Sequence, residues 1–360
     1  MTSWLAFLVT LSLIILVHEW GHFIMARLIG VKVERFSFGF GPLLLRWTRS
    51  GTEYVLSLLP FGGYVKLAGE VEEGRSAPAK PWEYRGRSIA ERGSIVLAGP
   101  LINYAVGFML FFIVFMVGAP VYTTRIGHVL KDYPGAQAGL REGDRILAVN
   151  GKPVDAWEEM TRSIQAQIDS VTLTVEREGK RFPQVIHPKV LERTNLFGTT
   201  TRLGMVGITP SDEVRTQRYS PAQAFTRAGT QVWFLTRVTL ISLWGIVTGG
   251  ISLKESFTGP IGIFYITSSV AQQGIVPLLQ LIAVLSTSIG LFNFLPIPVL
   301  DGGHLAFLAV EKFRGRAVSL RTQEAMTRVG LGLLLFLLAV VTYNDLLRFN
   351  IGGRLMGLFQ

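Results

Sequence analysis

The sequence predicts a polytopic α-helical membrane protein with four transmembrane helices, a membrane-associated β-hairpin and one extracytoplasmic α+β domain. Three observations predict this class. Four apolar runs are each long enough to cross a bilayer, which takes about 20 residues. Two β-prone runs follow the first of them, and a stretch between the second and third has the pattern of a water-facing domain. Hydrophobic residues make up 49% of the 360-residue chain, which fits several spans plus a folded aqueous part.

The apolar runs divide the chain into segments with alternating membrane sidedness. Basic residues concentrate in the loop after the first span and in the loop after the third, whereas none precedes the first span. By the positive-inside rule both loops are cytoplasmic, and the two termini lie outside. The predicted spans are 1–29, 95–118, 275–304 and 329–360, and the cytoplasmic loops are 30–94 and 305–328.

The region 211–274 contains a helical pattern at 220–244 whose length would also suit a span. Arg227 and Arg237 interrupt its apolar face. We therefore expect an amphipathic, membrane-associated helix and a linker here. A fifth crossing is the alternative, and it would invert the sidedness of everything downstream.

The composition excludes several classes of function. The net charge of +10 comes from basic residues beside apolar runs, as expected next to anionic lipid head groups, and no basic-aromatic motif suggests nucleic-acid binding. Cysteine is absent, so disulfides and thiolate metal sites are excluded, and any metal must use His, Asp or Glu. The first apolar run lacks a basic start and a small-residue cleavage site, so we interpret it as a retained span rather than a signal peptide.

The first span contains the HExxH pattern His18-Glu19-Trp20-Gly21-His22. On a helix the two imidazoles, four residues apart, share one face and can reach one metal ion. Glu19 lies where a carboxylate can accept a proton from water activated by that metal. Titratable groups inside a span are costly and indicate a functional site. The alternative is an ordinary helix that happens to contain two histidines and a glutamate.

A third ligand is predicted near the end of the third span, since catalytic zinc sites usually have three protein ligands. The run from Asn293 to His304 contains Pro296 and Pro298, which bend or unwind a helix. Asp301 follows in an otherwise apolar stretch, where its carboxylate needs a cation, and a metal ion held by His18 and His22 would supply one. The alternative is a helix-end carboxylate at the membrane surface.

The first cytoplasmic loop predicts a hairpin. One β-prone run leads through Gly39-Phe40-Gly41 to residue 47, a turn lies at 49–52, and a second run covers 53–60. Its faces are apolar enough to dip into the membrane where protein shields the edge. An open edge is also a template for a substrate strand. A hairpin that merely packs against the helices is the alternative.

The soluble stretch lies within 119–210. A strand at 126–129, a short helix near 134–140, a strand at 145–149, an Asn-Gly turn, a helix at 155–168 and a strand at 171–177 are predicted. The run AGLREGDRILAVNG at 138–151 resembles a circularly permuted bacterial PDZ domain. PDZ domains bind peptides by adding a strand to a sheet edge, here near 125–129. A PDZ domain that acts only as a spacer is the alternative.

Together, HEWGH in the first span, the Gly-Phe-Gly loop, Ala98-Gly99-Pro100 with Asn103, the PDZ-like stretch and NFLPIPVLDGGH resemble the site-2 protease (M50) family, of the bacterial RseP type. The resemblance implies Zn²⁺ on His18, His22 and Asp301, with Glu19 as general base. It also implies that Asn293 helps to hold the substrate or the oxyanion, and that Gly39, Phe40 and Gly41 pair with the substrate. His304 is not a ligand in the family pattern. Unlike members with two tandem PDZ domains, this chain has room for one.

The resemblance implies an intramembrane zinc endopeptidase of the bacterial inner membrane. Its substrates would be single-span membrane proteins that have already been trimmed outside, such as anti-sigma factors and signal peptide remnants, with the PDZ domain as a size filter or product-end sensor. A non-catalytic PDZ scaffold with a structural metal site is the main alternative, although a structural zinc has no use for a free base such as Glu19. A zinc transporter is disfavoured because no further intramembrane ligands would pass the ion along.

Overall fold

The computed structural model describes residues 3–70, 79–194, 200–251 and 258–348. The chain divides into two compact units, one formed by residues 1–114 with 221–360 and the other by residues 115–220. Each unit is described by itself.

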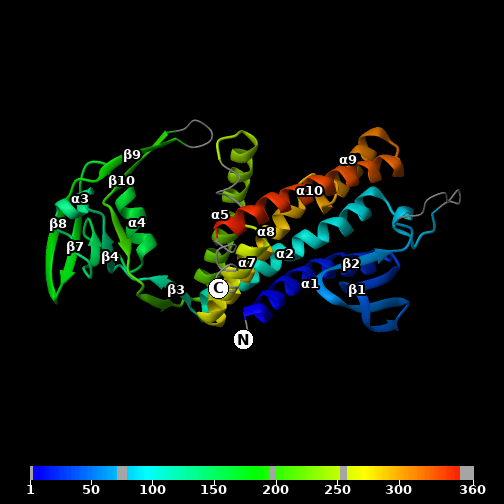
Figure 1. The fold of residues 1–360 in the computed structure, drawn as a ribbon, viewed down its shortest axis with the longest axis horizontal. Coiled ribbons are helices and arrows are strands. Elements are labelled where there is room, and N and C mark those ends of the chain that lie inside the picture. The colour runs from blue at the N-terminus through cyan, green and yellow to red at the C-terminus, as the bar shows by residue number, and fades with distance from the viewer. Residues whose placement is uncertain (1–2, 71–78, 195–199, 252–257, 349–360) are drawn as a thin grey trace, which may run out of the picture. The chain divides into compact units, whose positions relative to one another are not determined.

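The first unit is mainly helical (Figure 1). Its helices are α1 (Ser3–Ile29), α2 (Ile89–Val117), α5 (Pro221–Val247), α7 (Pro260–Gln272), α8 (Ile275–Asn293), α9 (Asp301–Arg314) and α10 (Leu320–Arg348), with the short 3₁₀ helix η1 at Tyr84–Gly86. Five of the described helices, α1, α2, α5, α8 and α10, are long and apolar enough to cross a membrane. The sequence predicted four, and the additional candidate is α5.

Side-chain contacts define how the helices run relative to one another. His22, near the end of α1, contacts the backbone of Ile95, near the start of α2, so these helices are antiparallel. Ile14 packs against Leu278 of α8 in a buried cluster, while the segment after α8 reaches His18, so α8 runs parallel to α1.

The last helix, α10, runs back in the opposite direction. Gly330, in its first half, lies next to Pro298. Asp345, near its end, is fully buried and accepts a 2.8 Å hydrogen bond from the backbone N–H of Gly262 in the first turn of α7. Phe264, two residues after Gly262, packs on Trp4 at the start of α1, with ring centroids 4.3 Å apart. The four helices α1, α2, α8 and α10 therefore alternate in direction.

The segment 305–328, predicted as the cytoplasmic loop between two spans, has helical structure of its own. Most of it is helical, because α9 continues to Arg314 and α10 begins at Leu320. Phe307 and Leu308 give α9 a buried face, and Gly315 ends it in the left-handed conformation with φ of 67°. The predicted break at Pro296 and Pro298 is present, since α8 ends at Asn293 and α9 begins at Asp301.

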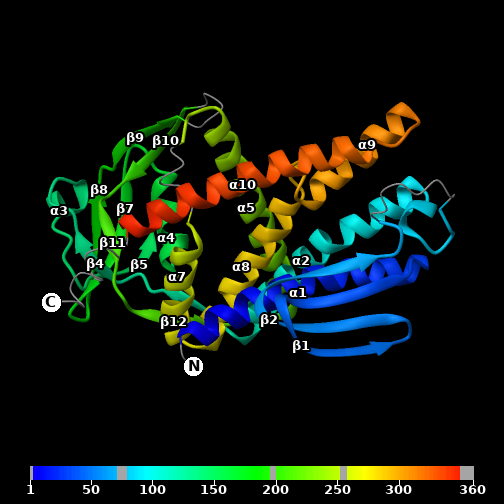
Figure 2. The same cartoon turned by 45° about the vertical axis from the view of Figure 1, so that its right-hand side comes forward.

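Strands β1 (Val33–Arg49) and β2 (Thr52–Leu67) are longer than the sequence suggested and form a more complex sheet than a simple hairpin. Phe36 is paired with both Tyr54 and Val65, whereas Trp47 is paired with Tyr54. The first half of β1 thus lies between the two halves of β2, and the second half of β2 forms one edge. Strand β2 lies along α1 (Figure 2).

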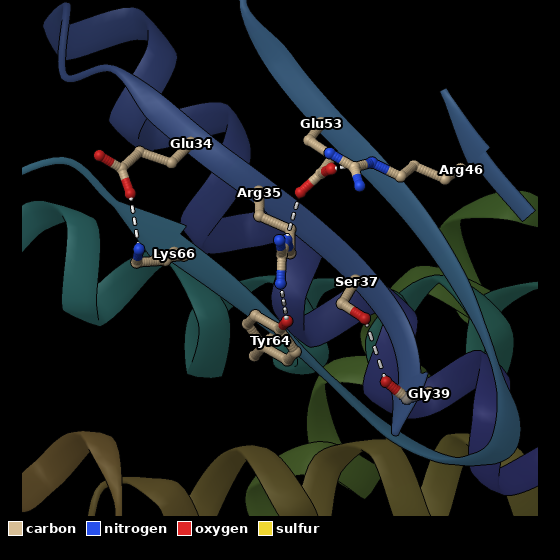
Figure 3. A network of polar contacts seen from close by, with 8 residues as sticks. All are labelled: Glu34, Arg35, Ser37, Gly39, Arg46, Glu53, Tyr64 and Lys66. Carbon is tan, nitrogen blue, oxygen red and sulfur yellow. Dashed lines mark hydrogen bonds and ion pairs between the residues drawn. The ribbon is translucent and has the colours of Figure 1, made fainter. Parts of the chain in front are cut away.

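One face of this sheet packs on α1 through a core that includes Phe23, Phe36, Tyr54 and Val65. The opposite face carries a network of charged and polar side chains (Figure 3). Gly39 and Gly41 have φ of 89° and 86°, which favours glycine and lets β1 bend between its halves.

The second unit is an α+β domain. A sheet of order β6-β5-β7-β8 is formed by β5 (Arg145–Val149), β6 (Lys152–Pro153), β7 (Val171–Arg177) and β8 (Lys180–Ile186). Two-stranded pairs join β3 (Ala119–Tyr122) to β12 (Val214–Gln217), β4 (Ile126–Val129) to β11 (Ile208–Pro210), and β9 (Lys189–Thr194) to β10 (Thr200–Met205).

The sheet and the helices α3 (Pro134–Gln137) and α4 (Trp157–Gln165) enclose one buried core, in which Ile146, Met160 and Leu173 are fully buried. Asn150 and Gly151 both have positive φ, as the predicted Asn-Gly turn requires.

Candidate metal centre

Helix α1 presents His18 and His22 on one face, one turn apart. Their rings are 4.8 Å apart at an angle of 84°, and the two Nε2 atoms are separated by 3.2 Å. The spacing of four residues in the sequence produces this proximity because an α-helix has 3.6 residues per turn.

Asp301, the first residue of α9, is the third candidate metal ligand beside His18 and His22. Its Oδ2 atom lies 3.1 Å from His18 Nε2 and 3.4 Å from His22 Nε2. The following residues are Gly302 and Gly303, where an added Cβ would collide with the backbone carbonyls of 294–297. Glycine at both positions therefore allows the chain after α8 to turn tightly and bring Asp301 to α1.

Each imidazole is oriented by a contact at its Nδ1 atom. His22 Nδ1 donates to the carbonyl oxygen of Ile95 at 2.9 Å, which leaves Nε2 as the free lone pair. His18 Nδ1 faces the side-chain amide of Asn103 at 3.5 Å, and the backbone carbonyl of Asn103 accepts a hydrogen bond from Ser286 Oγ at 2.9 Å.

Asn103 is fully buried, and its Oδ1 has no hydrogen-bond partner among the described residues. Turning the amide over satisfies Oδ1 with the N–H of His18 Nδ1, because the oxygen and nitrogen of an amide are assigned from such networks. Both histidines then present Nε2 to Asp301.

Helix α2 approaches the two histidines closely at Gly99. A Cβ at this position would lie 2.9 Å from His18 Cε1 and closer still to His22 Nε2. The absence of a side chain at Gly99 therefore makes room for both imidazoles.

The three converging atoms fit a zinc ion. Asp301 Oδ2 is buried with no hydrogen-bond partner among the described residues, and it faces the Nε2 atoms of both histidines. Zinc bonds of about 2.0–2.1 Å at tetrahedral angles separate neighbouring ligand atoms by about 3.3–3.4 Å. The measured separations of 3.1, 3.2 and 3.4 Å agree with that spacing. No other group of three His, Asp or Glu side chains with this geometry occurs in the described ranges.

The group opens into a cavity of about 480 Å³. Glu19 and Asn293 line it, and the edge of the sheet contributes Tyr64, Val65 and Leu67. Glu19 lies against that edge, where a Cβ at Gly63 would be 3.2 Å from its Cγ. The side chains of His18, His22 and Asp301 are 12%, 13% and 17% exposed, so a ligand reaches them through this cavity.

Gly39, Phe40 and Gly41 are not in the lining of this cavity. Phe40 instead stacks on the ring of Tyr64, with centroids 6.2 Å apart and planes at 15°. Sequence reasoning missed Tyr64 and the contact of Asn103 with His18. The polar Asn103 inside an apolar run was a signal that could have found the second of these.

Two histidines and a carboxylate around one point, with a glutamate beside them, define a metal-dependent hydrolase, and the long apolar helices place it among membrane proteins. A model of peptidase family M50 matches residues 6–337. The chain therefore belongs to this family and is a zinc metalloendopeptidase.

Curated relatives agree with this assignment. A Rhizobium meliloti protein named "Putative zinc metalloprotease" is 34% identical, over 94% of this chain and 95% of that protein. A Brucella suis protein of the same name is 35% identical, with 94% of each covered. Protease RseP of Yersinia pestis is 30% identical over 95% of this chain and 98% of that protein, in an alignment of 446 residues that exceeds this chain's length.

Among solved structures, the PDZ domain of an SdrC-like protein from Listeria monocytogenes is 24% identical and covers 26% of this chain and 87% of that chain. Its TM-score of 0.19 is too low to establish a shared fold.

Proposed function

We propose that this protein cleaves peptide bonds within membrane-spanning segments, with zinc held by His18, His22 and Asp301 and with Glu19 as the general base. The observation that supports this most directly is the convergence of three candidate ligand atoms at a cavity that Glu19 also lines. A structural zinc site would have four protein ligands and no cavity beside it.

Zinc bound by these residues would supply Lewis acidity, which polarises the scissile carbonyl and acidifies the attacking water. The carboxylate of Glu19 accepts the proton of that water and then delivers it to the nitrogen of the leaving amine. Asn293, which lines the cavity at the end of α8, would donate its amide N–H to the substrate carbonyl. Asn103 and the carbonyl of Ile95 hold the two imidazoles in the required orientation.

A helical substrate hides its carbonyls in its own hydrogen bonds and must unwind before it is cut. The second half of β2 is a sheet edge that lines the cavity, so an extended substrate segment can add to it as a strand. Gly39, Phe40 and Gly41 would contribute from the neighbouring bend of β1, since Phe40 supports Tyr64 of that edge.

Four crossings, with α5 beside the bundle, agree best with the metal site. Contact between Asp301 and His18 requires α8 to cross in the same direction as α1. If α5 also crossed, the chain would have to return through α7, whose 13 residues extend only about 20 Å against an apolar layer of about 30 Å. With four crossings, the basic loops favour a metal site toward the cytoplasmic side of a bacterial inner membrane.

The second unit has the strand–helix order of a PDZ domain, and we assign it to peptide recognition outside the cytoplasm. It would exclude substrates whose outer domains remain intact. Pre-trimmed single-span proteins, including anti-sigma factors and signal peptide remnants, are the substrates that such a filter admits, in regulated intramembrane proteolysis.

The test measures zinc content and cleavage of a membrane-spanning reporter by the purified protein in lipid vesicles. Glu19→Gln is expected to keep one zinc per chain and to lose cleavage by at least about 10²-fold, because the general base is gone. Asp301→Ala is expected to lose both zinc and cleavage. Glu34→Gln, at an exposed ion pair of the sheet, is the control and should behave as the wild type.

Wild-type cleavage by Glu19→Gln would refute the role of this carboxylate, and retained zinc in Asp301→Ala would refute the ligand set. Wild-type protein that binds zinc and cleaves no membrane-spanning reporter would instead support a PDZ scaffold.

A further inference from the structure

A polar network crosses the sheet face that points away from the α1 core (Figure 3). Arg35 lies at its centre. Its Nε donates to Glu53 Oε2 at 2.5 Å, and its Nη1 donates to the hydroxyl of Tyr64 at 3.2 Å. The other carboxylate oxygen of Glu53 pairs with Arg46, from the second half of β1. A single guanidinium thus connects the first half of β2 with its edge half.

This network differs from an ordinary surface ion pair. The Glu53 side chain is only 14% exposed, so its charge needs the cations that flank it. By contrast, the neighbouring pair Glu34–Lys66, at 2.9 Å, is 40% and 63% exposed, and it lies apart from Tyr64 in the same view. Such an exposed pair contributes little to stability or geometry.

Tyr64 is the member of the network that reaches the metal cavity. Its ring is constrained twice, by the stacked ring of Phe40 and by the hydrogen bond from Arg35 to its hydroxyl. The preceding residue is Gly63, against which Glu19 packs. Tyr64 and Glu19 line the same cavity, so the position of the Tyr64 ring shapes the wall of that cavity.

We propose that Arg35, oriented by Glu53, is a positioning residue of the endopeptidase site: it fixes the ring of Tyr64 as the wall against which an extended substrate segment lies. This inference rests on the proposed function, because it assigns the sheet edge to substrate. The planar fork of arginine is required, since one ammonium group cannot reach Glu53 and the Tyr64 hydroxyl with the same two-directional geometry.

The experiment is a double-mutant cycle on cleavage of the membrane-spanning reporter. Arg35→Met and Tyr64→Phe are each expected to lower kcat/KM by roughly three- to ten-fold, the scale of one partly exposed hydrogen bond to a charged group. The kcat/KM of the double variant should be no lower than that of the less active single variant, because both changes remove the same contact. Arg35→Lys should resemble Arg35→Met.

A second readout is independent of turnover. In the inactive Glu19→Gln background, Arg35→Met and Tyr64→Phe should each weaken binding of a fluorescently labelled reporter peptide, while zinc content stays at one per chain. Glu34→Gln, at the exposed ion pair of the same sheet, is the matched control, and it should leave both cleavage and binding unchanged. If Arg35→Met does not fold, Tyr64→Phe, which removes a single hydroxyl, still decides the question.

Additive losses in the double variant would overturn the inference, as would wild-type cleavage and binding by Arg35→Lys or Tyr64→Phe. A wild-type protein that cleaves no reporter would refute the proposed function instead, and the binding measurement would still test Arg35.

Discussion

The close approach of α2 to the histidines gives a sharp prediction for Gly99→Ala. The added Cβ would be 2.9 Å from His18 Cε1, which is 0.5 Å short of the 3.4 Å at which ordinary van der Waals contact begins, and it would overlap His22 Nε2 more severely. Both rings must move by more than the ~0.2 Å within which metal–ligand distances are held.

We expect zinc affinity to fall by on the order of 10–100-fold, which is about 1.4–2.7 kcal/mol and similar to the loss of a contact that orients a ligand. Competition with a chromophoric chelator measures this affinity on the folded protein, and reporter cleavage at limiting zinc should fall in parallel. Helix propensity acts in the opposite direction, since alanine favours a helix by up to about 1 kcal/mol over glycine, so a loss of affinity cannot arise from a weakened α2.

Gly93→Ala is the matched control on the same helix. Its Cβ would meet Leu308 Cδ1 at 4.0 Å, which is ordinary contact, so zinc affinity should be unchanged. If Gly99→Ala binds zinc within a factor of about two of the Gly93→Ala variant, the histidines do not occupy the positions described, and the reasoning from this cavity is refuted.

Two further predictions concern stability. Asp144 is 1% exposed and binds Arg177 through two 2.7 Å contacts, so Asp144→Ala should destabilise the second unit by about 3 kcal/mol. The loss should appear as faster amide hydrogen exchange in β7, while the zinc content stays the same. Unchanged exchange in β7 would contradict the prediction. Burial raises the pKa of the Glu70 carboxyl above its ordinary value of 4.5. The folded protein therefore loses stability as the pH rises above 4.5 and this buried carboxyl is forced to ionise. The melting temperature of Glu70→Gln should therefore exceed that of the wild type at pH 8, and the difference should disappear as the pH is lowered toward 4.5. A difference that does not depend on pH would refute this cause.

Much of the metal site was predictable from local sequence, because its ligands follow helical spacing or a chain break. His18 and His22 lie on one face since they are four residues apart, and two prolines as close as Pro296 and Pro298 favour a break between helices. The meeting of Asp301 with α1 was inferred from the charge it needs, and the structure brings the three residues together.

Contacts between distant segments were not predictable in the same way. The sequence indicated two strands, but no periodicity shows that Phe36 pairs with both Tyr54 and Val65. The contact of Arg35 with Tyr64 depends on that register, as does the place of Tyr64 in the cavity wall. The helix at 301–314 was missed because its charged residues resemble a loop, although Phe307 and Leu308 bury one side.

The separation of the ligands along the chain has a consequence for biosynthesis. His18 and His22 leave the ribosome early, and Asp301 follows only after most of the polypeptide has been made. At about 5–20 residues per second, the histidine pair waits on the order of tens of seconds for its carboxylate. A nascent chain being inserted beside other new membrane proteins therefore has an incomplete centre, and proteolytic competence arises only once the last helices have docked.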